Sequence, residues 1–292
     1  MDRYTDRVAV ITGAGSGFGR EFARLALRRG MKLVLADVQD DALAATVAEL
    51  ALPAARLLAE RVDVARAADV ERLADRAFDR FGGVDLLFNN AGVGAGGFVW
   101  ESSAADWSWV LGVNLMGVVH GIRSFVPRMI EAARHGPAGH VVNTASIAGW
   151  LCPPTMGVYN VSKHAVVALT ETLHHDLQLT GSAIGVSLLC PAFVPTGIAD
   201  AERNRPAEYA VPAAPTPSQR LHRQATAKAV AGGRISAAEV AALTFEAIEQ
   251  RRFYVFTHPQ ILPSLQARFD AVMRGGAPAD PYAARPEVRP RN

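Results

Sequence analysis

The chain has 292 residues, of which 50% are hydrophobic and 20% are charged. This balance is typical of a globular protein that buries a sizeable core, and it excludes a disordered or fibrous chain. The formal net charge is only +2 and the basic residues are scattered, which argues against nucleic acid and anionic membranes as partners and favours a small-molecule ligand.

The cysteines and the first residues bear on the compartment. Cys152 and Cys190 allow one disulfide at most, and Met1-Asp2-Arg3-Tyr4 lacks the apolar stretch of a secretory signal. No uninterrupted apolar run reaches the roughly eighteen residues that cross a bilayer. We therefore expect a cytoplasmic protein with reduced cysteines.

Short runs of β-branched and aliphatic residues alternate with longer segments in which apolar residues recur at helical spacing. The predicted strands are 8–12, 32–37, 57–62, 85–89, 140–145, 184–190 and 253–256. The predicted helices are 18–29, 41–50, 67–81, a long one around 107–134, 156–179 and 237–250. This alternation predicts an α/β fold with a parallel sheet covered on both faces, the Rossmann-like doubly wound arrangement.

The alternation breaks over 197–233, where four prolines interrupt a segment rich in Ala, Arg and Gln. Long connections in compact α/β domains tend to be lids or binding loops, so we expect a Pro-rich substrate lid; a surface insertion without a role is the alternative. A second Pro-rich stretch, 277–292, predicts a weakly ordered tail. The chain is thus expected to form one domain, 1–276, followed by that tail.

A glycine-rich turn, Thr12-Gly13-Ala14-Gly15-Ser16-Gly17-Phe18-Gly19, links the first predicted strand to the first predicted helix. Glycines let the chain turn sharply there and bring backbone N–H groups to a pyrophosphate at the positive end of a helix. We expect Gly13, Ser16, Gly17, Phe18 and Gly19 to bind a dinucleotide. Phe18 stands where the usual fingerprint has its third glycine, so a plain strand-to-helix turn is the alternative.

Asp37 ends the second predicted strand, where a carboxylate would meet the adenosine ribose. A carboxylate there accepts hydrogen bonds from the ribose hydroxyls and repels a 2′-phosphate, which favours NAD over NADP; a solvated strand-end residue is the alternative. Ligands of open parallel sheets lie beyond the carboxyl ends of the strands, so residues after the third and fourth strands should also reach the cofactor. These residues are Asp63, Val64, Asn90, Ala91 and Gly92.

Ser146 closes the fifth predicted strand, and Tyr159-Asn160-Val161-Ser162-Lys163 follows on a predicted helix. A spacing of four places Tyr159 and Lys163 on one helical face, close enough for the ammonium to stabilise a phenolate. An unperturbed tyrosine has a pKa of about 10, so it serves as a general base near neutral pH only where positive charge favours its ionised form. An exposed helix face without catalytic meaning is the alternative for this pair.

Taken together in this order, the motifs resemble those of the short-chain dehydrogenase/reductase family. The pattern TGxxxGxG, the sequence NNAG, a catalytic Asn, and Ser followed by YxxxK correspond to 12–19, 89–92, Asn114, Ser146, and Tyr159 with Lys163. The resemblance covers roughly 8–256. It implies that Tyr159 is the acid/base, that Ser146 holds the substrate oxygen, that Lys163 binds the ribose and tunes Tyr159, and that Asn114 orders a proton-relaying water.

The resemblance carries further expectations. Pro191, Val194 and Thr196 match positions beside the nicotinamide, of which the last two hold the carboxamide. Ala192 replaces the family's usual glycine, so we expect a differently shaped turn there. Hydride transfer to the B face and a homodimer or homotetramer are also implied. An amide at Asn114 in the long helix can distort the local backbone and expose a carbonyl.

The residues expected around the reacting carbon are mostly apolar, which favours a secondary alcohol or ketone on an aromatic, alicyclic or terpenoid skeleton. Ser146, Trp150, Phe193 and Tyr209 are the candidate substrate contacts, with Trp150 as a cavity wall or as plain core. Arg203 and Arg205 could clamp a carboxylate, but solvated arginines are the commoner case.

The other chemistry-bearing side chains indicate no metal and no second nucleophile. His174 and His175 are adjacent on a helix and have no third ligand at a suitable spacing, so we expect surface or interface residues and no metal. Both cysteines are expected to be packed thiols.

Two rival functions remain. The chain could be a catalytically inactive NAD-sensing protein, or an epimerase or dehydratase of the extended branch of the same family. The intact Asn114, Ser146, Tyr159 and Lys163 argue against the first, and the absence of Gly-x-x-Gly-x-x-Gly spacing and of a longer C-terminal domain argues against the second. Enoyl reduction is disfavoured because the related reductases generally place six residues between Tyr and Lys.

Overall fold

The computed structural model describes residues 3–134, 136–211, 214–283 and 289. Its centre is one seven-stranded parallel sheet in the order β3-β2-β1-β4-β5-β6-β7. The chain reverses its direction of travel across the sheet between β3 and β4, because β4 pairs with the other edge of β1. The strands are β1 (Val8–Thr12), β2 (Lys32–Asp37), β3 (Leu57–Arg61), β4 (Leu86–Asn89), β5 (His140–Thr144), β6 (Gly185–Cys190) and β7 (Tyr254–Phe256).

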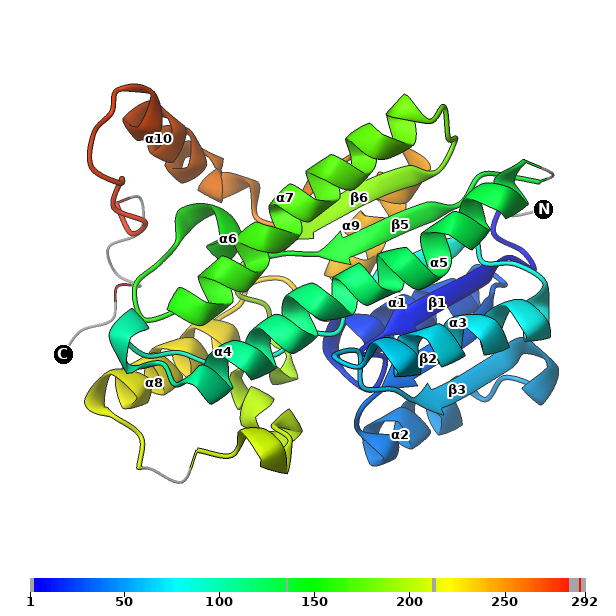
Figure 1. The fold of residues 1–292 in the computed structure, drawn as a ribbon, viewed down its shortest axis with the longest axis horizontal. Coiled ribbons are helices and arrows are strands. Elements are labelled where there is room, and N and C mark those ends of the chain that lie inside the picture. The colour runs from blue at the N-terminus through cyan, green and yellow to red at the C-terminus, as the bar shows by residue number, and fades with distance from the viewer. Residues whose placement is uncertain (1–2, 135, 212–213, 284–288, 290–292) are drawn as a thin grey trace.

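Helices cover both faces of this sheet (Figure 1). The helices are α1 (Gly17–Arg28), α2 (Asp40–Leu50), α3 (Ala67–Phe81), α4 (Ala104–Leu111), α5 (Gly117–Ala133), α6 (Ala148–Leu151), α7 (Gly157–Leu179), α8 (Pro217–Ala231), α9 (Ala237–Glu249) and α10 (Leu262–Met273). One layer contains α1, α2 and α9, and the other contains α3, α5 and α7. The predicted doubly wound fold is confirmed.

Alternate residues of the strands supply the two cores, as the pleat of a strand requires. Ala9 and Ile11 of β1 pack with Phe22 of α1 and Phe245 of α9, whereas Val8 and Val10 pack with α3 and α5. Because both faces are covered, β1 is buried at every position. The carboxyl ends of β1, β2, β4 and β5 are therefore held rigidly at one edge of the sheet.

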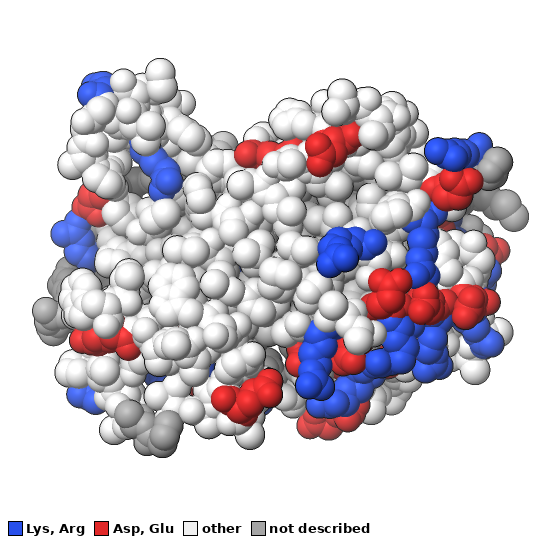
Figure 2. Space-filling model, in the orientation of Figure 1, with Lys and Arg blue, Asp and Glu red and all other residues white. Residues whose placement is uncertain are grey.

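The predicted strand and helix boundaries agree with the structure to within one residue, except at the long helix. That helix begins earlier, at Ala104, and runs through a π-helical turn over Gly112–Met116 to Ala133. Ala104–Ala133 has the length and mean hydropathy of a membrane span, but 56% of its most apolar window is buried inside the protein. It is therefore a core helix of this fold. The middle of the molecular face over α5 and α7 is largely uncharged apart from one basic patch, and acidic side chains lie along its upper edge and at its right (Figure 2).

The 197–233 segment has more regular structure than its prolines suggest. It contains 3-10 helices over Gly197–Asn204 and Ala207–Tyr209 and the fifteen-residue α8. Pro217 occupies the first turn of α8, where its missing N–H costs nothing. Figure 1 shows α8 beside α4, and α10 near the C-terminal end, where α10 packs against α6 and the Phe269 ring meets Trp150. Of the predicted tail, 284–288 and 290–292 lie outside the described residues.

Candidate functional site

One large cavity of about 1550 Å³ runs along the carboxyl ends of the strands. It extends from the glycine-rich turn, past the ends of β4 and β5, to the 197–233 segment and the residues before α10. All predicted nucleotide and catalytic residues line it except Gly19 and Asn114. The sequence motifs therefore converge on a single place.

The glycine-rich turn is shaped by close backbone approach. Gly13 has a φ of +68°, and a Cβ on it would lie 2.9 Å from Cα of Ala91. A Cβ on Gly19 would lie 2.0 Å from the carbonyl oxygen of Gly13, so α1 packs directly on the turn. Ser16 makes no side-chain cap on α1, and Gly17 and Phe18 of its first turn line the cavity. Uncapped N–H groups at a helix N-terminus suit a pyrophosphate.

Asp37 lies at the far end of the same turn. Its Oδ2 accepts a hydrogen bond of 2.8 Å from Gly15 N, and its Oδ1 accepts one of 2.9 Å from Gln39 N. A Cβ on Gly15 would lie 2.9 Å from Oδ2, so a larger residue would crowd this carboxylate. Asp37 is thus fixed at the cavity wall, next to the turn that follows β1.

The segment after β4 is tied to the end of β1. Thr12 Oγ1 accepts hydrogen bonds from Asn90 N and Ala91 N at 3.0 and 3.1 Å, and Asn90 Nδ2 donates to Thr12 O at 3.0 Å. Asp63 and Val64 line the neighbouring stretch of cavity after β3. The sequence motif marks Thr12 only as its first residue, and the bonding role of Thr12 follows from the strand order β1-β4.

Lys163 is buried at the end of β5. Its Nζ donates to Thr144 O at 2.8 Å and lies 5.7 Å from the centroid of the Tyr159 ring. Burial lowers the pKa of Lys163 to about 8. Burial raises the pKa of Tyr159, and a hydrogen bond with Ser146 acts in the opposite direction. The two side chains come from successive turns of α7, as the spacing of four predicts.

Ser146 and Asn114 complete this end of the cavity. Ser146 Oγ accepts a hydrogen bond of 3.1 Å from Ala148 N and donates to Pro191 O at 3.3 Å. Asn114 is fully buried in the π-helical turn, where Oδ1 accepts from Val93 N at 2.8 Å and Nδ2 donates to Val93 O at 2.9 Å. The predicted backbone distortion at Asn114 is present as this turn.

The side chains of Asn114 and Lys163 both lie close to Gly92. A Cβ on it would lie 3.5 Å from both Asn114 Oδ1 and Lys163 Nζ. On the opposite side, Val194 is buried and Thr196 approaches Gly17, since a Cβ on that glycine would lie 3.4 Å from the threonine side chain. Ala192 is not among the described residues with positive φ, so the turn after β6 does not need the family's usual glycine.

Three of the four predicted substrate contacts line the cavity, and one does not. Phe193 and Tyr209 line the cavity, and so does Ser146. Trp150 does not: it is only 8% exposed, its Nε1 contacts Cys190 Sγ at 3.3 Å, and its ring packs edge-on against Tyr254. The structure therefore favours the core alternative for Trp150, because α6 turns its ring toward β6 and away from the cavity.

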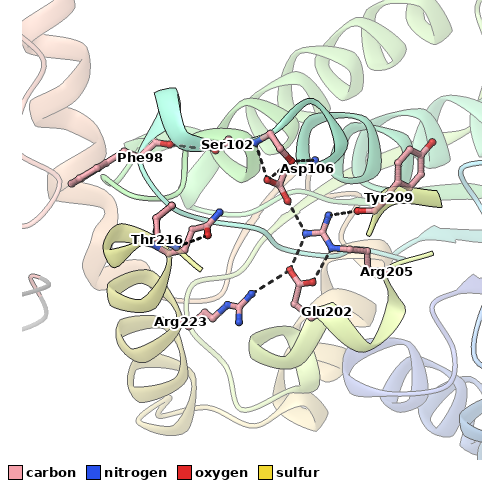
Figure 3. Close-up of polar contacts among 10 residues, drawn as sticks. Phe98, Ser102, Asp106, Glu202, Arg205, Tyr209, Thr216 and Arg223 are labelled. Carbon is pink, nitrogen blue, oxygen red and sulfur yellow. Dashed lines mark hydrogen bonds and ion pairs between the residues drawn. The ribbon is translucent and has the colours of Figure 1, made fainter. Parts of the chain in front are cut away.

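Two expectations about charged and sulfur side chains are corrected. The Arg205 side chain is not solvated but 9% exposed, because Asp106 and Glu202 pair with its guanidinium (Figure 3). Cys152 is exposed rather than packed, since it follows α6 in a left-handed conformation, while Cys190 is buried as expected. Among the described residues, no group of three His, Cys, Asp or Glu side chains is placed to hold a metal ion.

Sequence reasoning missed two features of the substrate end. His222 of α8 lines the cavity and packs closely on Gly96, where a Cβ would be 2.2 Å from its ring. Glu101 accepts hydrogen bonds from Thr216 and Ser218 at the start of α8. The run Gly94-Ala95-Gly96-Gly97 is the one signal in the sequence that another element packs closely there.

Known proteins match this chain over most of its length. A family model described as short chain dehydrogenase matches residues 7–207. A CLA biosynthesis dehydrogenase/reductase of Lactiplantibacillus plantarum is 36% identical over 95% of this chain and 97% of its own length. A 1-deoxy-11-beta-hydroxypentalenate dehydrogenase of Streptomyces exfoliatus is 36% identical over 92% of this chain and 89% of its own.

A solved structure gives the same picture in three dimensions. The crystal structure of a short chain dehydrogenase/reductase from Burkholderia phymatum in complex with NAD is 56% identical, with a TM-score of 0.92. The match covers 96% of this chain and 99% of that one.

Proposed function

The chain belongs to the short-chain dehydrogenase/reductase family and is an oxidoreductase, and from this premise we propose that it uses NAD to interconvert a secondary alcohol and a ketone. The observation that carries the proposal is the shared cavity. Asp37 and the glycine-rich turn line one end of it, and Ser146, Tyr159 and Lys163 line the middle. A dinucleotide in the first position would bring its reactive ring to the second.

NAD rather than NADP is proposed for three reasons. Asp37 stands at the cavity wall, where its charge would repel a 2′-phosphate. The uncapped first turn of α1 offers N–H groups for the pyrophosphate, and Val194 and Thr196, which also line the cavity, are proposed to hold the carboxamide. The Burkholderia phymatum relative was solved with NAD.

The proposed chemistry is divided among four side chains. Bound NAD⁺ would accept the hydride of the carbinol carbon, and we expect its B face to do so. Tyr159 Oη takes the proton of the substrate hydroxyl, and Ser146 Oγ hydrogen-bonds the same oxygen. Lys163 binds the ribose hydroxyls and favours the Tyr159 phenolate by its charge. Asn114, held between Val93 and Ser162, keeps the π-helical turn open toward a proton-relaying water.

The substrate is proposed to be hydrophobic and bulky. Beyond Tyr159 the cavity wall includes the apolar side chains of Val93, Trp109, Met156, Phe193 and Tyr209, beside polar ones such as His222. Mostly apolar cavities with few polar groups bind apolar skeletons. We propose an aromatic, alicyclic or terpenoid alcohol, and the relative named as a hydroxypentalenate dehydrogenase is consistent with a hydroxylated carbon skeleton.

We further propose that 197–233 is a lid and belongs to a domain formed by 1–276, with 277–292 as a tail. The segment lines the substrate end of the cavity and reaches the nucleotide end, where Gln39 Nε2 donates to Arg203 O at 3.2 Å. A homodimer or homotetramer in the cytoplasm is proposed, and the free thiols of both cysteines fit a reducing compartment.

The test is NAD⁺ reduction with a panel of secondary alcohols, comparing the wild type with Tyr159→Phe. We expect oxidation of bulky apolar alcohols by the wild type, a loss of about 10²- to 10⁴-fold in the variant, and unchanged NADH binding. A variant that keeps a tenth of wild-type turnover would contradict the role of Tyr159. NADH binding without turnover on any alcohol would favour a sensor, and substrate conversion without net NADH would favour an epimerase.

A further inference from the structure

Arg205 lies near the start of the proposed lid, and its side chain is only 9% exposed. Its Nη2 donates to Asp106 Oδ1 at 2.7 Å and to Glu202 Oε1 at 2.8 Å, and its Nε donates to Glu202 Oε2 at 2.8 Å. Its Nη1 donates to Tyr209 O at 3.3 Å (Figure 3). All three nitrogens of the guanidinium are therefore engaged within the protein.

The guanidinium also lies on an aromatic ring. Arg205 Cζ is 4.1 Å from the centroid of Trp109, which is fully buried. Trp109 belongs to the apolar cluster of Val93 and Ala201, against which Tyr209 packs. Arginine suits such a place because its planar group stacks and pairs with a carboxylate through two parallel bonds at once.

Asp106 connects this contact to the catalytic end. Its Oδ2 accepts from Ser103 N at 2.9 Å and from Ser103 Oγ at 2.8 Å, which caps α4, while Oδ1 is left for Arg205. From α4 the chain runs without a break into the π-helical turn that holds Asn114. The ion pair between Arg205 and Asp106 therefore links the lid to α4, the helix that leads into the turn of Asn114.

A second fastening lies on the other side of the lid. Thr216 Oγ1 donates to Glu101 Oε2 at 2.6 Å, Ser218 Oγ donates to the same oxygen, and Ser218 Oγ accepts from Phe98 N at 2.9 Å. Both carboxylates, Glu101 and Asp106, come from one stretch of chain before and within α4. The lid thus closes on that stretch at two separate points.

We propose that Arg205 is a positioning residue that holds the lid closed over the substrate and does not itself bind substrate. This rests on the proposed function of the cavity. Breaking a buried ion pair leaves an unpaired charge, which disfavours the closed lid. Because substrate binds the closed form, its apparent affinity falls as the closed fraction falls.

The experiment compares Arg205→Met, Arg205→Lys and Glu202→Gln with Arg220→Met, an exposed arginine of the same lid. Methionine keeps the apolar contact with Trp109 and loses every hydrogen bond. For Arg205→Met we expect KM to rise on the order of tenfold, with NADH affinity unchanged and faster proteolytic cleavage within 197–233. Lysine should recover part of the loss, Glu202→Gln should shift both readouts in the same direction, and Arg220→Met should match the wild type.

Two results would overturn the proposal. One is an unchanged KM and cleavage rate in both Arg205→Met and Glu202→Gln. The other is a loss confined to alcohols that carry a carboxylate, because a positioning residue must affect neutral and charged alcohols equally. Cleavage in the presence of NADH needs no turnover, so it decides the role of Arg205 even if the wild type oxidises no alcohol and the proposed function fails.

Discussion

Asp37 is the residue on which we expect the choice of cofactor to depend. Asp37→Ala should weaken NAD⁺ by about 1.5 to 3 kcal/mol, the value of hydrogen bonds to a charged group, and should improve NADP⁺ by removing a like-charge repulsion. The ratio of kcat/KM for the two cofactors, measured at matched ionic strength, checks this. Asp40→Ala changes an exposed carboxylate nearby and serves as the control.

The two cofactors must move in opposite directions. Asp37 also accepts hydrogen bonds from Gly15 N and Gln39 N, so a damaged turn would weaken both cofactors together. An unchanged ratio, or a wild type that prefers NADP⁺, would mean that Asp37 does not select the cofactor.

The protonation state of Tyr159 predicts opposite pH dependences for alcohol oxidation and ketone reduction. Burial raises the pKa of Tyr159, so the phenol is protonated at neutral pH in the free protein. Alcohol oxidation needs the phenolate as base and should speed up as pH rises, whereas ketone reduction needs the phenol as acid and should slow down. Initial rates in both directions across the pH range measure this.

Lys163→Met supplies the control for that assignment. Without the ammonium, which lies 5.7 Å from the ring, the phenolate is less stable, so the rise in oxidation should move to higher pH. Identical pH profiles for wild type and variant would remove Lys163 from the role of tuning Tyr159.

Local spacing in the sequence was enough to predict which side chains meet at the cavity, while their catalytic roles stay predictions. Tyr159 and Lys163 are four residues apart on one helix, and Ser146 lies two residues after the end of β5. The sequence predicts a solvated Arg205 because arginines in polar loops are usually exposed, and its partner Asp106 lies 99 residues away, where no local signal indicates the contact. Trp150 could not be decided, because the side to which a short helix turns its ring depends on packing.

The contact between α8 and the glycine run predicts the effect of one methyl group. A Cβ on Gly96 would lie 2.2 Å from Cγ of His222, so Gly96→Ala must push that ring, and α8 with it, away. Forcing a methyl into a packed contact costs about 1 to 3 kcal/mol, which corresponds to a rise in KM of roughly 5- to 150-fold if the closed lid carries that cost.

Two further variants make this measurement specific. Gly96→Ala combined with His222→Ala opens the space again and should recover most of the loss. Gly83→Ala is the matched control, because a Cβ on Gly83 would meet no atom within 4 Å. If the double variant is as impaired as Gly96→Ala alone, the loss does not come from the contact of α8 with Gly96.

Helices and strands could be predicted where their apolar residues recur with the period of a helix or of a strand. The buried strands and the amphipathic helices α1 and α3 have clear patterns, and their boundaries were predicted closely. α8 was missed because four prolines dominate its surroundings, although Thr216 and Gln219 form a capping box that marks its start. A helix that packs on a glycine run rather than on the main core leaves only a weak apolar stripe.

The alternation of strands and helices along the chain does not indicate the order of the strands within the sheet. Alternation predicts parallel strands and two helical layers, but many orders satisfy it. The order β3-β2-β1-β4-β5-β6-β7 is fixed by which strands share a core, such as Ile11, Leu33 and Phe88 in one cluster. That order places Thr12 beside Asn90 and thereby brings the two ends of the cavity together.

We expect copies of this chain to assemble through the face formed by α5 and α7. The outer side of α7 presents Val161, Ala168 and Thr172 to solvent, and α5 is preceded by the exposed Met116. Few charged side chains cover this face (Figure 2). Uncharged faces of this kind mark contact surfaces between chains, and we expect two copies to meet here about a twofold axis.

Ala168→Glu should therefore disrupt the assembly. In a twofold interface each substitution occurs twice, so two carboxylates would be buried among the apolar side chains of the contact, at a cost of several kcal/mol. Sedimentation velocity should show a dimer or tetramer for the wild type and smaller species for Ala168→Glu, while Ala238→Glu, on the exposed side of α9, should behave as the wild type. Because one chain supplies Asn114, Ser146, Tyr159 and Lys163, the dissociated variant should still bind NADH. A wild type that is monomeric at every concentration, or an Ala168→Glu variant with unchanged assembly, would show that α5 and α7 do not form the interface.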